Sequence, residues 1–356
     1  WVLDGPRYCM TNTCSCLFDW VRDAARACFS KKPEAEFSHC PTVSVLIVGL
    51  NEGDTLAGTI ESIVGTYPRL EIVVVDDGSD DRMTEVAREC ARRYGGVKVV
   101  SRVWRGGKSS ALNIAASHAS GEILVAVDSD SPLDPDAVWE IVQPFRNPNV
   151  GVVAATVRVR NAFTNSCTWM QGFEYLQSIF VGRKTAARLR ILPIASGAFA
   201  AYRRDLVMRL GGWDIGPGED LDMVLRIRKL GYCVDFAQYA YCHTEAPTKW
   251  KALFKQRRRW DGDGPVRHLL RKHNDIANPF APGFRLSNLF TFLDGVTFNL
   301  LCGLFVLVWA ATAICYPEYR PSGFVWLTMY AAAVAAEITP FFALMYYSRH
   351  RMTDAI

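Results

Sequence analysis

The sequence lacks two of the simplest functional signatures. It has no paired Cys-x-x-Cys framework, which structural zinc sites usually have, and no Walker A spacing, which excludes a phosphate-binding loop of the NTPase type. Its eleven cysteines are scattered along 356 residues, so we expect reduced, unpaired thiols in a cytosolic compartment. The alternative is a zinc site near the start of the chain, formed by Cys9, Cys14, Cys16 and Cys28.

A large net charge is also missing. The formal charge is +4, which decides little, whereas half of the residues are apolar and 12% are aromatic, too many for a disordered chain. The basic residues gather ahead of an apolar run instead of interleaving on a soluble face, so nucleic-acid binding is not supported. Such a cluster suits anionic lipid headgroups or a nucleotide diphosphate, and the alternative is a solvated helix face. Its members are Lys249, Lys251, Lys255, Arg257, Arg258 and Arg259.

Two long apolar runs close the sequence. Val296–Tyr316 is an uncharged run of 21 residues and Gly323–Tyr347 is a run of 25, each long enough to span a bilayer. The short connection between them permits only a hairpin, and the basic residues lie on its outer flanks. By the positive-inside rule, we expect a plasma (inner) membrane protein whose preceding domain and chain end are cytosolic. Because the sequence begins at Trp1 and has no signal peptide, we expect a piece of a longer protein with further membrane helices upstream.

The middle of the chain alternates apolar strands with helices, which predicts an α/β domain with a mainly parallel sheet. Ligands of such sheets bind beyond the carboxyl ends of the strands. A basic-ended helix suited to a membrane surface is expected at 166–190, and a tight turn into a strand at 196–203. The other expected strands are Val43–Val48, Leu70–Val75, Val97–Val100 and Ile123–Val127, and the expected helices are Thr55–Thr66, Met83–Tyr94, Ser109–Ser117 and Leu221–Leu230.

These patterns divide the chain into four parts. Residues 1–40 form an N-terminal segment, 41–247 the α/β domain, 248–288 amphipathic interfacial helices, and 289–356 a transmembrane helical hairpin. Within the first part, residues 17–29 have the apolar spacing of one helix face. That helix either lies along a bilayer or packs as an ordinary helix.

Polar motifs follow the strands of the expected sheet. Asn51-Glu52 and Asp76-Asp77-Gly78-Ser79 follow the first two strands, and a carboxylate there can accept a hydrogen bond from a base N–H; the alternative is a plain turn. Asp128-Ser129-Asp130 offers two carboxylates to a hard cation such as Mg²⁺ or Mn²⁺. Gly106-Gly107-Lys108 lets the backbone approach a phosphate and supplies a charge, and the alternative is a solvated loop lysine.

Two further motifs lie on helices. Gly218-Glu219-Asp220 opens a helix, where an acid can act as a base but is also favoured by the helix dipole alone. Gln256, Arg259 and Trp260 form a Gln-x-x-Arg-Trp pentad and share one side of an α-helix. Arg259 can hold a pyrophosphate and Trp260 can stack on a sugar ring. The alternative is a basic interfacial helix with a Trp anchor.

This ordered set of motifs resembles the processive family-2 glycosyltransferases, which include cellulose, chitin, hyaluronan and poly-N-acetylglucosamine synthases. The resemblance covers roughly residues 42–265 and implies a GT-A nucleotide-sugar-binding fold. It implies that Asp77 binds the uracil, that Asp130 is the principal metal ligand, and that Asp220 is the catalytic base. The family has a comparable Gly-Lys followed by Ala-Leu-Asn, matched here at 107–113. Gly218 stands where the family often has Thr.

The site residues expected on these grounds fall into four groups. The catalytic residues are Asp220 and Glu219; the donor-binding residues are Asn51, Glu52, Asp77, Lys108, Asp128, Gln256 and Arg259; the acceptor residues are Trp260, Ser196 and Gly197; and the metal ligands are Asp130 and Asp128.

The function expected is an inverting β-glycosyltransferase that polymerises a polysaccharide from a UDP-sugar and exports it across the bilayer. The residues around Ser196-Gly197 slightly favour an amino sugar such as UDP-GlcNAc. A polyprenyl-phosphate sugar transferase is the first alternative, but that class lacks the pentad. A non-catalytic membrane scaffold is the second, and it would be expected to lose Asp128, Asp130 or Asp220, all of which are present.

Overall fold

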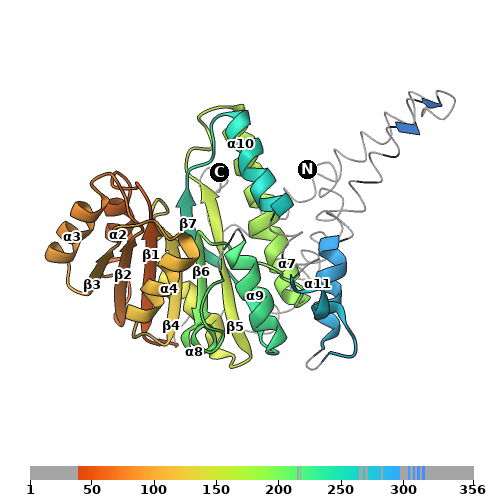
Figure 1. The fold of residues 1–356 in the computed structure, drawn as a ribbon, viewed down its shortest axis with the longest axis horizontal. Helices are drawn as coiled ribbons and strands as arrows, with labels where there is room; N and C mark the ends of the chain where they lie inside the picture. The colour runs from red at the N-terminus through yellow and green to blue at the C-terminus, as the bar shows by residue number, and fades with distance from the viewer. Residues whose placement is uncertain are drawn as a thin grey trace, which may run out of the picture.

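A seven-stranded sheet forms the centre of the protein, in the order β3-β2-β1-β4-β6-β5-β7 (Figure 1). The computed structural model describes residues 39–214, 216, 218–263, 268, 272–281 and 284–296, and six isolated residues between 304 and 316. β6 runs antiparallel to both of its neighbours and the other pairs are parallel. The strands are β1 (Val43–Gly49), β2 (Leu70–Asp76), β3 (Val97–Ser101), β4 (Ile123–Asp128), β5 (Val150–Val159), β6 (Phe199–Arg203) and β7 (Cys233–Thr244).

The four strands expected before residue 130 are confirmed, each one residue longer at its carboxyl end. That extra residue is Asp76 in β2 and Asp128 in β4, so both polar motifs begin inside the sheet. β5 and β7 are not among the expected strands. The apolar run Val150–Ala155, in the first half of β5, is typical of a strand buried on both faces and was the signal available for β5.

Helices cover both faces of the sheet, because alternate residues of each strand point to opposite sides. Val45 and Ile47 of β1 face the layer of α2 (Leu56–Ile63), α3 (Met83–Arg93) and α5 (Ala137–Val142). Leu46, between them, faces the layer of α4 (Lys108–His118), α8 (Arg204–Arg209) and α9 (Glu219–Lys229). These three strand residues are fully buried, so the middle of β1 is the centre of the core.

The helical segment between β5 and β6 differs from expectation. Residues 166–190 are not one α-helix: α6 (Ser166–Tyr175) passes into a π-helical stretch, η2 (Leu176–Gly182), before α7 (Arg183–Arg188). α6 begins with a capping box in which Asn165 and Thr168 exchange hydrogen bonds. The remaining elements are η1 (Gln143–Arg146), α10 (Trp250–Arg257), η3 (Arg258–Asp263), η5 (Asn274–Ala277) and α11 (Leu286–Val296).

Three expectations for the ends of the chain fall on residues outside this description. The cysteines at 9–28, the helix at 17–29 and nearly all of the hairpin at 289–356 lie there. Among the residues that are described, no helix has both the length and the apolar character needed to cross a bilayer.

Candidate active site

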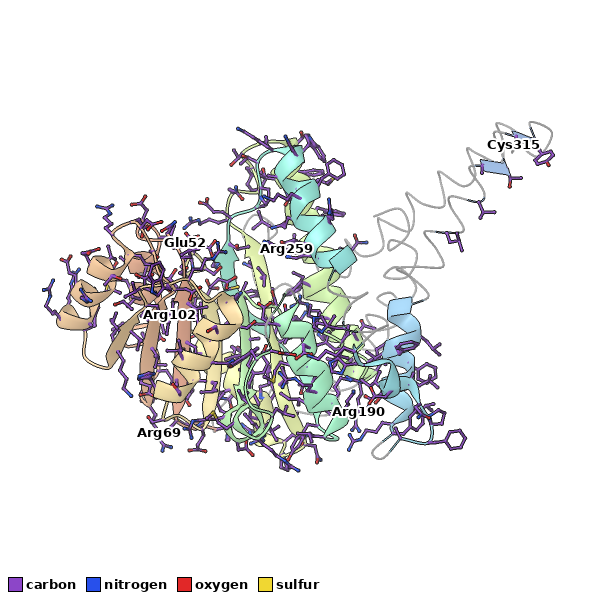
Figure 2. The ribbon with its side chains drawn as sticks, viewed as in Figure 1. Glu52, Arg69, Arg102, Arg190, Arg259 and Cys315 are labelled. Atoms are coloured by element: carbon purple, nitrogen blue, oxygen red, sulfur yellow. The ribbon has the colours of Figure 1, made fainter. Side chains whose placement is uncertain are left out.

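The expected site lies at the carboxyl end of β1, where the order of the strands in the sheet reverses. β1 has β2 and β3 on one side and β4 on the other, and open α/β sheets bind ligands at such a switch point. The last residues pair across it, Gly49 with Asp76 and Val48 with Asp128. Glu52 and Arg102 lie at this carboxyl end of the sheet, opposite Arg69 (Figure 2).

Asp77 holds the glycine-rich loop in place. Its Oδ1 accepts hydrogen bonds from Arg102 Nη1 at 2.9 Å and Gly106 N at 3.0 Å, and its Oδ2 accepts one from Gly107 N at 2.6 Å. The carboxylate is 4% exposed. A carboxylate offers about four acceptor positions, so one on Oδ2 is left for the N–H of a base. Neighbouring Asp76 is a turn residue that accepts from Ser79 N at 2.9 Å.

Asn51 and Glu52 have different positions at the end of β1. Asn51 has a φ of 59° and joins two loops, because its N–H donates to Ser79 Oγ at 2.9 Å and its Oδ1 accepts from Asp80 N at 2.8 Å. Glu52 instead accepts a hydrogen bond from Thr55 Oγ1 at 3.3 Å and is close enough to Asp128 and Asp130 to be affected by their charges. Burial, and then the charge of Asp130, raise the pKa of Glu52 above its ordinary value.

Lys108 is the meeting point of three motifs. Its Nζ lies 2.5 Å from Asp128 Oδ1, 3.8 Å from Glu219 Oε1 and 3.3 Å from the carbonyl oxygen of Gly197. Burial opposes its charge, but Asp128, Glu219 and Asp220 outweigh burial and raise the pKa of Lys108. Burial also raises the pKa of Glu219; Lys108 opposes that shift and Asp220 adds to it.

Asp130 extends this group of acids. Asp130 Oδ1 accepts a hydrogen bond from Ser131 Oγ at 3.0 Å, and burial, followed by the charge of Asp128, raises the pKa of Asp130. We use the name acidic cluster for Glu52, Asp128, Asp130, Glu219 and Asp220. Lys108 pairs directly with two of these five acids, Asp128 and Glu219, so negative charge is in excess in the acidic cluster. Such an excess fits a divalent cation, and Asp128 and Asp130 are the pair placed to hold it.

Asp220 faces the loop that contains Ser196 and Gly197. Its Oδ2 accepts a hydrogen bond from Gly197 N at 3.2 Å. A Cβ at Gly197 would lie 3.0 Å from Lys108 Nζ and 3.7 Å from Asp220 Oδ2, so this position lines the same space. Gly218, before the acids, has a φ of 81° in the left-handed region. That conformation is strained for a side chain such as Thr, which explains the glycine here.

The pentad does not lie on a single α-helix. α10 ends at Arg257 and continues as the π-helix η3, so the α-helical i, i+3, i+4 spacing assumed for Gln256, Arg259 and Trp260 does not apply. Gln256 is half-buried, with its Oε1 unbonded, whereas Arg259 and Trp260 are exposed. Arg257 makes the local contacts, pairing with Glu174 at 2.7 Å and lying 5.0 Å from the Trp260 ring.

Two residues that are not among the expected site residues, Arg102 and Asn113, support the site. Arg102 pairs with Asp77, and its position just after β3 was the signal available in the sequence. Asn113 pins the turn before α9 through its side-chain amide, which donates to Trp213 O at 2.8 Å and accepts from Trp213 N at 2.7 Å. Of the expected site residues, the described contacts bring together Lys108, Asp128, Glu219, Asp220 and Gly197. They do not bring Asn51, Ser196 or the pentad to this group.

Comparison with known families identifies the general class of protein to which this chain belongs. A family model described as "Glycosyltransferase like family 2" matches residues 41–262. The chain belongs to this family. The family-2 resemblance of the motifs is thereby confirmed, and these residues form a glycosyltransferase domain.

Two curated relatives show how far the likeness extends. The chain is 33% identical over 231 residues to the probable glycosyltransferase YdaM of Bacillus subtilis, covering 62% of this chain and 54% of that protein. It is 25% identical over 289 residues to a poly-beta-1,6-N-acetyl-D-glucosamine synthase of Staphylococcus epidermidis, covering 80% of this chain and 66% of that protein. The chain thus spans between about half and two thirds of the length of these relatives.

Solved structures confirm the fold. The mannosyltransferase PcManGT from Pyrobaculum calidifontis, in complex with GDP-Man and Mn²⁺, has a TM-score of 0.58 at 24% identity and covers 96% of this chain and 99% of that one. The TarS protein of S. aureus has a TM-score of 0.52 at 16% identity, covering 72% of this chain and 43% of that one. This likeness is one of fold, and it bears out the GT-A α/β domain with a mainly parallel sheet.

The raised pKa values predict a pH-dependent effect of divalent cations on stability. Without a cation, the contribution of Asp130 and Glu219 to the free energy of unfolding is fully present at pH values below the ordinary carboxyl pKa range. It is lost as the pH rises through their raised folded-state pKa values. Mg²⁺ or Mn²⁺ should therefore raise the thermal unfolding temperature more at about pH 8 than at about pH 5, where protons replace the cation.

Thermal unfolding of the full chain, with and without cation at both pH values, measures this effect. Asp130→Asn should lose most of the cation-induced shift, and Asp136→Asn serves as a control because Asp136 lies at the exposed start of α5. A shift of equal size at both pH values, or one retained in Asp130→Asn, contradicts the assignment.

Proposed function

We propose that this chain is the catalytic part of a membrane-bound, processive, inverting β-glycosyltransferase that extends a polysaccharide from a UDP-sugar at the cytosolic face. One observation carries the proposal: the ammonium of Lys108 pairs with Asp128, at the end of β4, and with Glu219, at the start of α9 beside Asp220. One space thus offers a positive charge for a leaving group and a carboxylate that can act as a base. The likeness to a poly-beta-1,6-N-acetyl-D-glucosamine synthase supports a polymer product and UDP-GlcNAc as the donor.

The residues of the site can carry out a direct displacement. Asp220, held by Gly197 N, accepts the proton of an acceptor hydroxyl whose oxygen then bonds to the anomeric carbon. The bond from that carbon to the diphosphate oxygen breaks as the new bond forms, and UDP leaves with the electron pair. Attack opposite the leaving group inverts the anomeric centre. Lys108 supplies a positive charge beside the diphosphate.

Asp128 and Asp130 would hold Mg²⁺ or Mn²⁺, which supplies further charge neutralisation to the diphosphate when bound. Export, the bilayer and further membrane helices enter the proposal from the apolar runs of the sequence. The pentad favours polymerisation over single transfer, as in the family members that make polymers.

The direct test offers radiolabelled UDP-sugars, singly and in pairs, to membranes containing the full chain. We expect label from UDP-GlcNAc in a long, lipid-free polymer, with Mg²⁺ or Mn²⁺ required. Label confined to a single sugar on a polyprenyl phosphate would instead indicate the transferase alternative, and a requirement for two donors would indicate a heteropolymer. No transfer from any UDP-sugar would contradict the proposal.

Asp220→Asn should abolish transfer and leave donor binding near normal, because a base acts in the transition state and not in donor affinity. Sugar transfer and UDP-sugar binding are measured on the same preparation. The control is Asp205→Asn, an exposed acid in the first turn of α8, which tests whether an acid at a helix start matters through the dipole alone. A parallel loss of donor binding and transfer would make Asp220 a donor-contact or structural residue.

Trp260→Ala should shorten the polymer more than it slows hydrolysis of the donor by water. The ring is 41% exposed and can stack on a sugar, a contact worth about 1–2 kcal/mol that also orients the acceptor hydroxyl. Water needs no such contact. UDP release and product length are measured together, with Trp250→Ala, a similarly exposed ring at the start of α10, as the control. Equal loss of both products would remove Trp260 from the acceptor site.

A further inference from the structure

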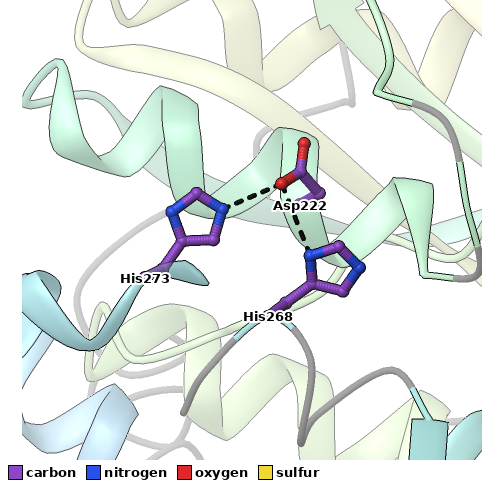
Figure 3. A group of neighbouring side chains, drawn as sticks. All are labelled: Asp222, His268 and His273. Atoms are coloured by element: carbon purple, nitrogen blue, oxygen red, sulfur yellow. Dashed lines mark hydrogen bonds and ion pairs between the residues drawn. The ribbon is translucent and has the colours of Figure 1, made fainter. Parts of the chain in front are cut away.

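A buried carboxylate lies two residues beyond Asp220 on the same helix. Asp222 is fully buried in the first turn of α9. Its Oδ2 pairs with Arg226 Nε at 2.8 Å, and its Oδ1 pairs with Lys272 Nζ at 2.6 Å, His273 Nε2 at 2.8 Å and His268 Nδ1 at 3.4 Å (Figure 3). We call these five residues the Asp222 cluster. One acid on α9 thus binds four nitrogen-bearing side chains.

Three of these side chains come from the segment that follows the pentad. His268, Lys272 and His273 follow Trp260 along the chain, so the Asp222 cluster joins this segment to the helix that begins with Asp220. Lys272 also pairs with Asp214, in the turn that leads into α9. Burial opposes ionisation of Asp222, but its bonds from His268, His273 and Lys272 hold its pKa far below the ordinary range. Asp222 is therefore an ionised, fully bonded anchor.

A second buried charge anchors the other end of α9. Arg228 is 2% exposed and donates to Arg190 O at 2.8 Å and Leu192 O at 3.1 Å. It also reaches α11, at Asn288 Oδ1, 3.1 Å away, and Thr291 Oγ1, 3.0 Å away. These acceptors are neutral, and burial lowers the pKa of Arg228 to about 10. Burying a charge costs free energy, which offsets much of what the hydrogen bonds of Arg228 contribute to the stability of the fold. These hydrogen bonds therefore matter more for the position of α9 than for net stability.

A metal site is the other chemistry that the Asp222 cluster suggests. The ligand atoms of Asp222, His268 and His273 lie within 4.8 Å of one another, as the ligands of a transition metal do. However, Arg226 and Lys272 already occupy both oxygens of Asp222, and a cation at Oδ1 would meet the ammonium of Lys272 2.6 Å from that oxygen. Charge repulsion therefore favours an ion-pair cluster, and the experiment below includes metal binding as an outcome.

We propose that Asp222 and Arg228 are positioning residues that fix helix α9 against residues 268, 272 and 273, residues 190 and 192, and helix α11. These contacts would hold Asp220 in place relative to the acceptor. The inference rests on the proposed role of Asp220 as the base. A displacement of about 1 Å at a reacting group can cost about 100-fold in rate, so a shift of α9 relative to the acceptor side has a large effect on transfer. Donor binding depends on Asp77, Lys108 and the β4 aspartates, which lie on other elements.

The test removes the partners of Asp222 that lie outside helix α9, so that the helix carrying Asp220 is itself unchanged. In the full chain, His273→Gln and Lys272→Met should each lower the turnover number for transfer about 10- to 100-fold, with the KM for UDP-sugar unchanged. The ratio of transfer to donor hydrolysis should fall. Asp222→Asn should do the same, and combining it with His273→Gln should add little, because both changes break one bond. Arg228→Lys keeps the positive charge but loses the fork-shaped set of N–H donors of the guanidinium. It should likewise lower the turnover number and leave the KM for UDP-sugar unchanged.

Lys229→Met is the matched control. Lys229 pairs with Asp275 at 2.5 Å, which joins the same helix to the same segment through an exposed contact. Exposed pairs contribute little, about 0–1 kcal/mol, so this variant should transfer sugar like the wild type. An equal loss in Lys229→Met would overturn the proposal, since any loosening of the segment would then suffice.

Three other outcomes also overturn it. Turnover, donor affinity and unfolding temperature falling together would show that the Asp222 cluster only maintains the fold. One equivalent of Zn²⁺ bound by the wild type and lost in His273→Gln would make it a metal site. Unchanged transfer in all Asp222-cluster variants, while Asp220→Asn is inactive, would reject this inference alone. If Asp220→Asn itself remains active, the proposed base fails first, so the two failures are distinguishable.

Discussion

The charge balance around Lys108 is the constraint on which the site depends. The lysine comes from the start of α4, its nearest acid from the end of β4, and the next from the start of α9. Without this cation, the acids of β4 and α9 would lie together uncompensated, which low-dielectric surroundings make costly. The ion pairs therefore hold three separate elements at one point. They also leave the acidic cluster short of positive charge, so a cationic partner completes the arrangement.

Most of the other motif residues serve this arrangement indirectly. Asp77 binds the backbone of the loop that ends at Lys108, and Asn113 fixes the turn that precedes Glu219. Asn51 joins the loops after β1 and β2. These three residues therefore support loops of the site. Supporting a loop and contacting a ligand are compatible roles for Asp77, because its carboxylate retains an acceptor position after the loop is bound.

The sequence predicts the parts that depend on local pattern. Apolar runs ending in Asp or Asn mark β1, β2 and β4, and parallel pairing then brings their ends together without further information. The α-to-π change at Arg258 could not be predicted, because periodicity assumes one helix type and both types suit the same residues. The Asp222 cluster could not be predicted either. Asp222 and His273 are 51 residues apart, and Asp222 on its own is only an acid in the first turn of a helix.

The contacts that hold helix α9 in place matter for the proposed mechanism. A polymerising enzyme must let its acceptor advance by one sugar after each transfer while the base returns to the same place. A base on a loop would move with the acceptor, whereas Asp220 opens a helix bonded at its first turn by Asp222 and near its last turn by Arg228. Asp222 bonds to residues that follow the pentad, and Arg228 bonds to residues 190 and 192 and to helix α11. If Asp220 is the base, as proposed, these contacts fix its position relative to the segments around α9, so it would return to the same place while the donor is exchanged.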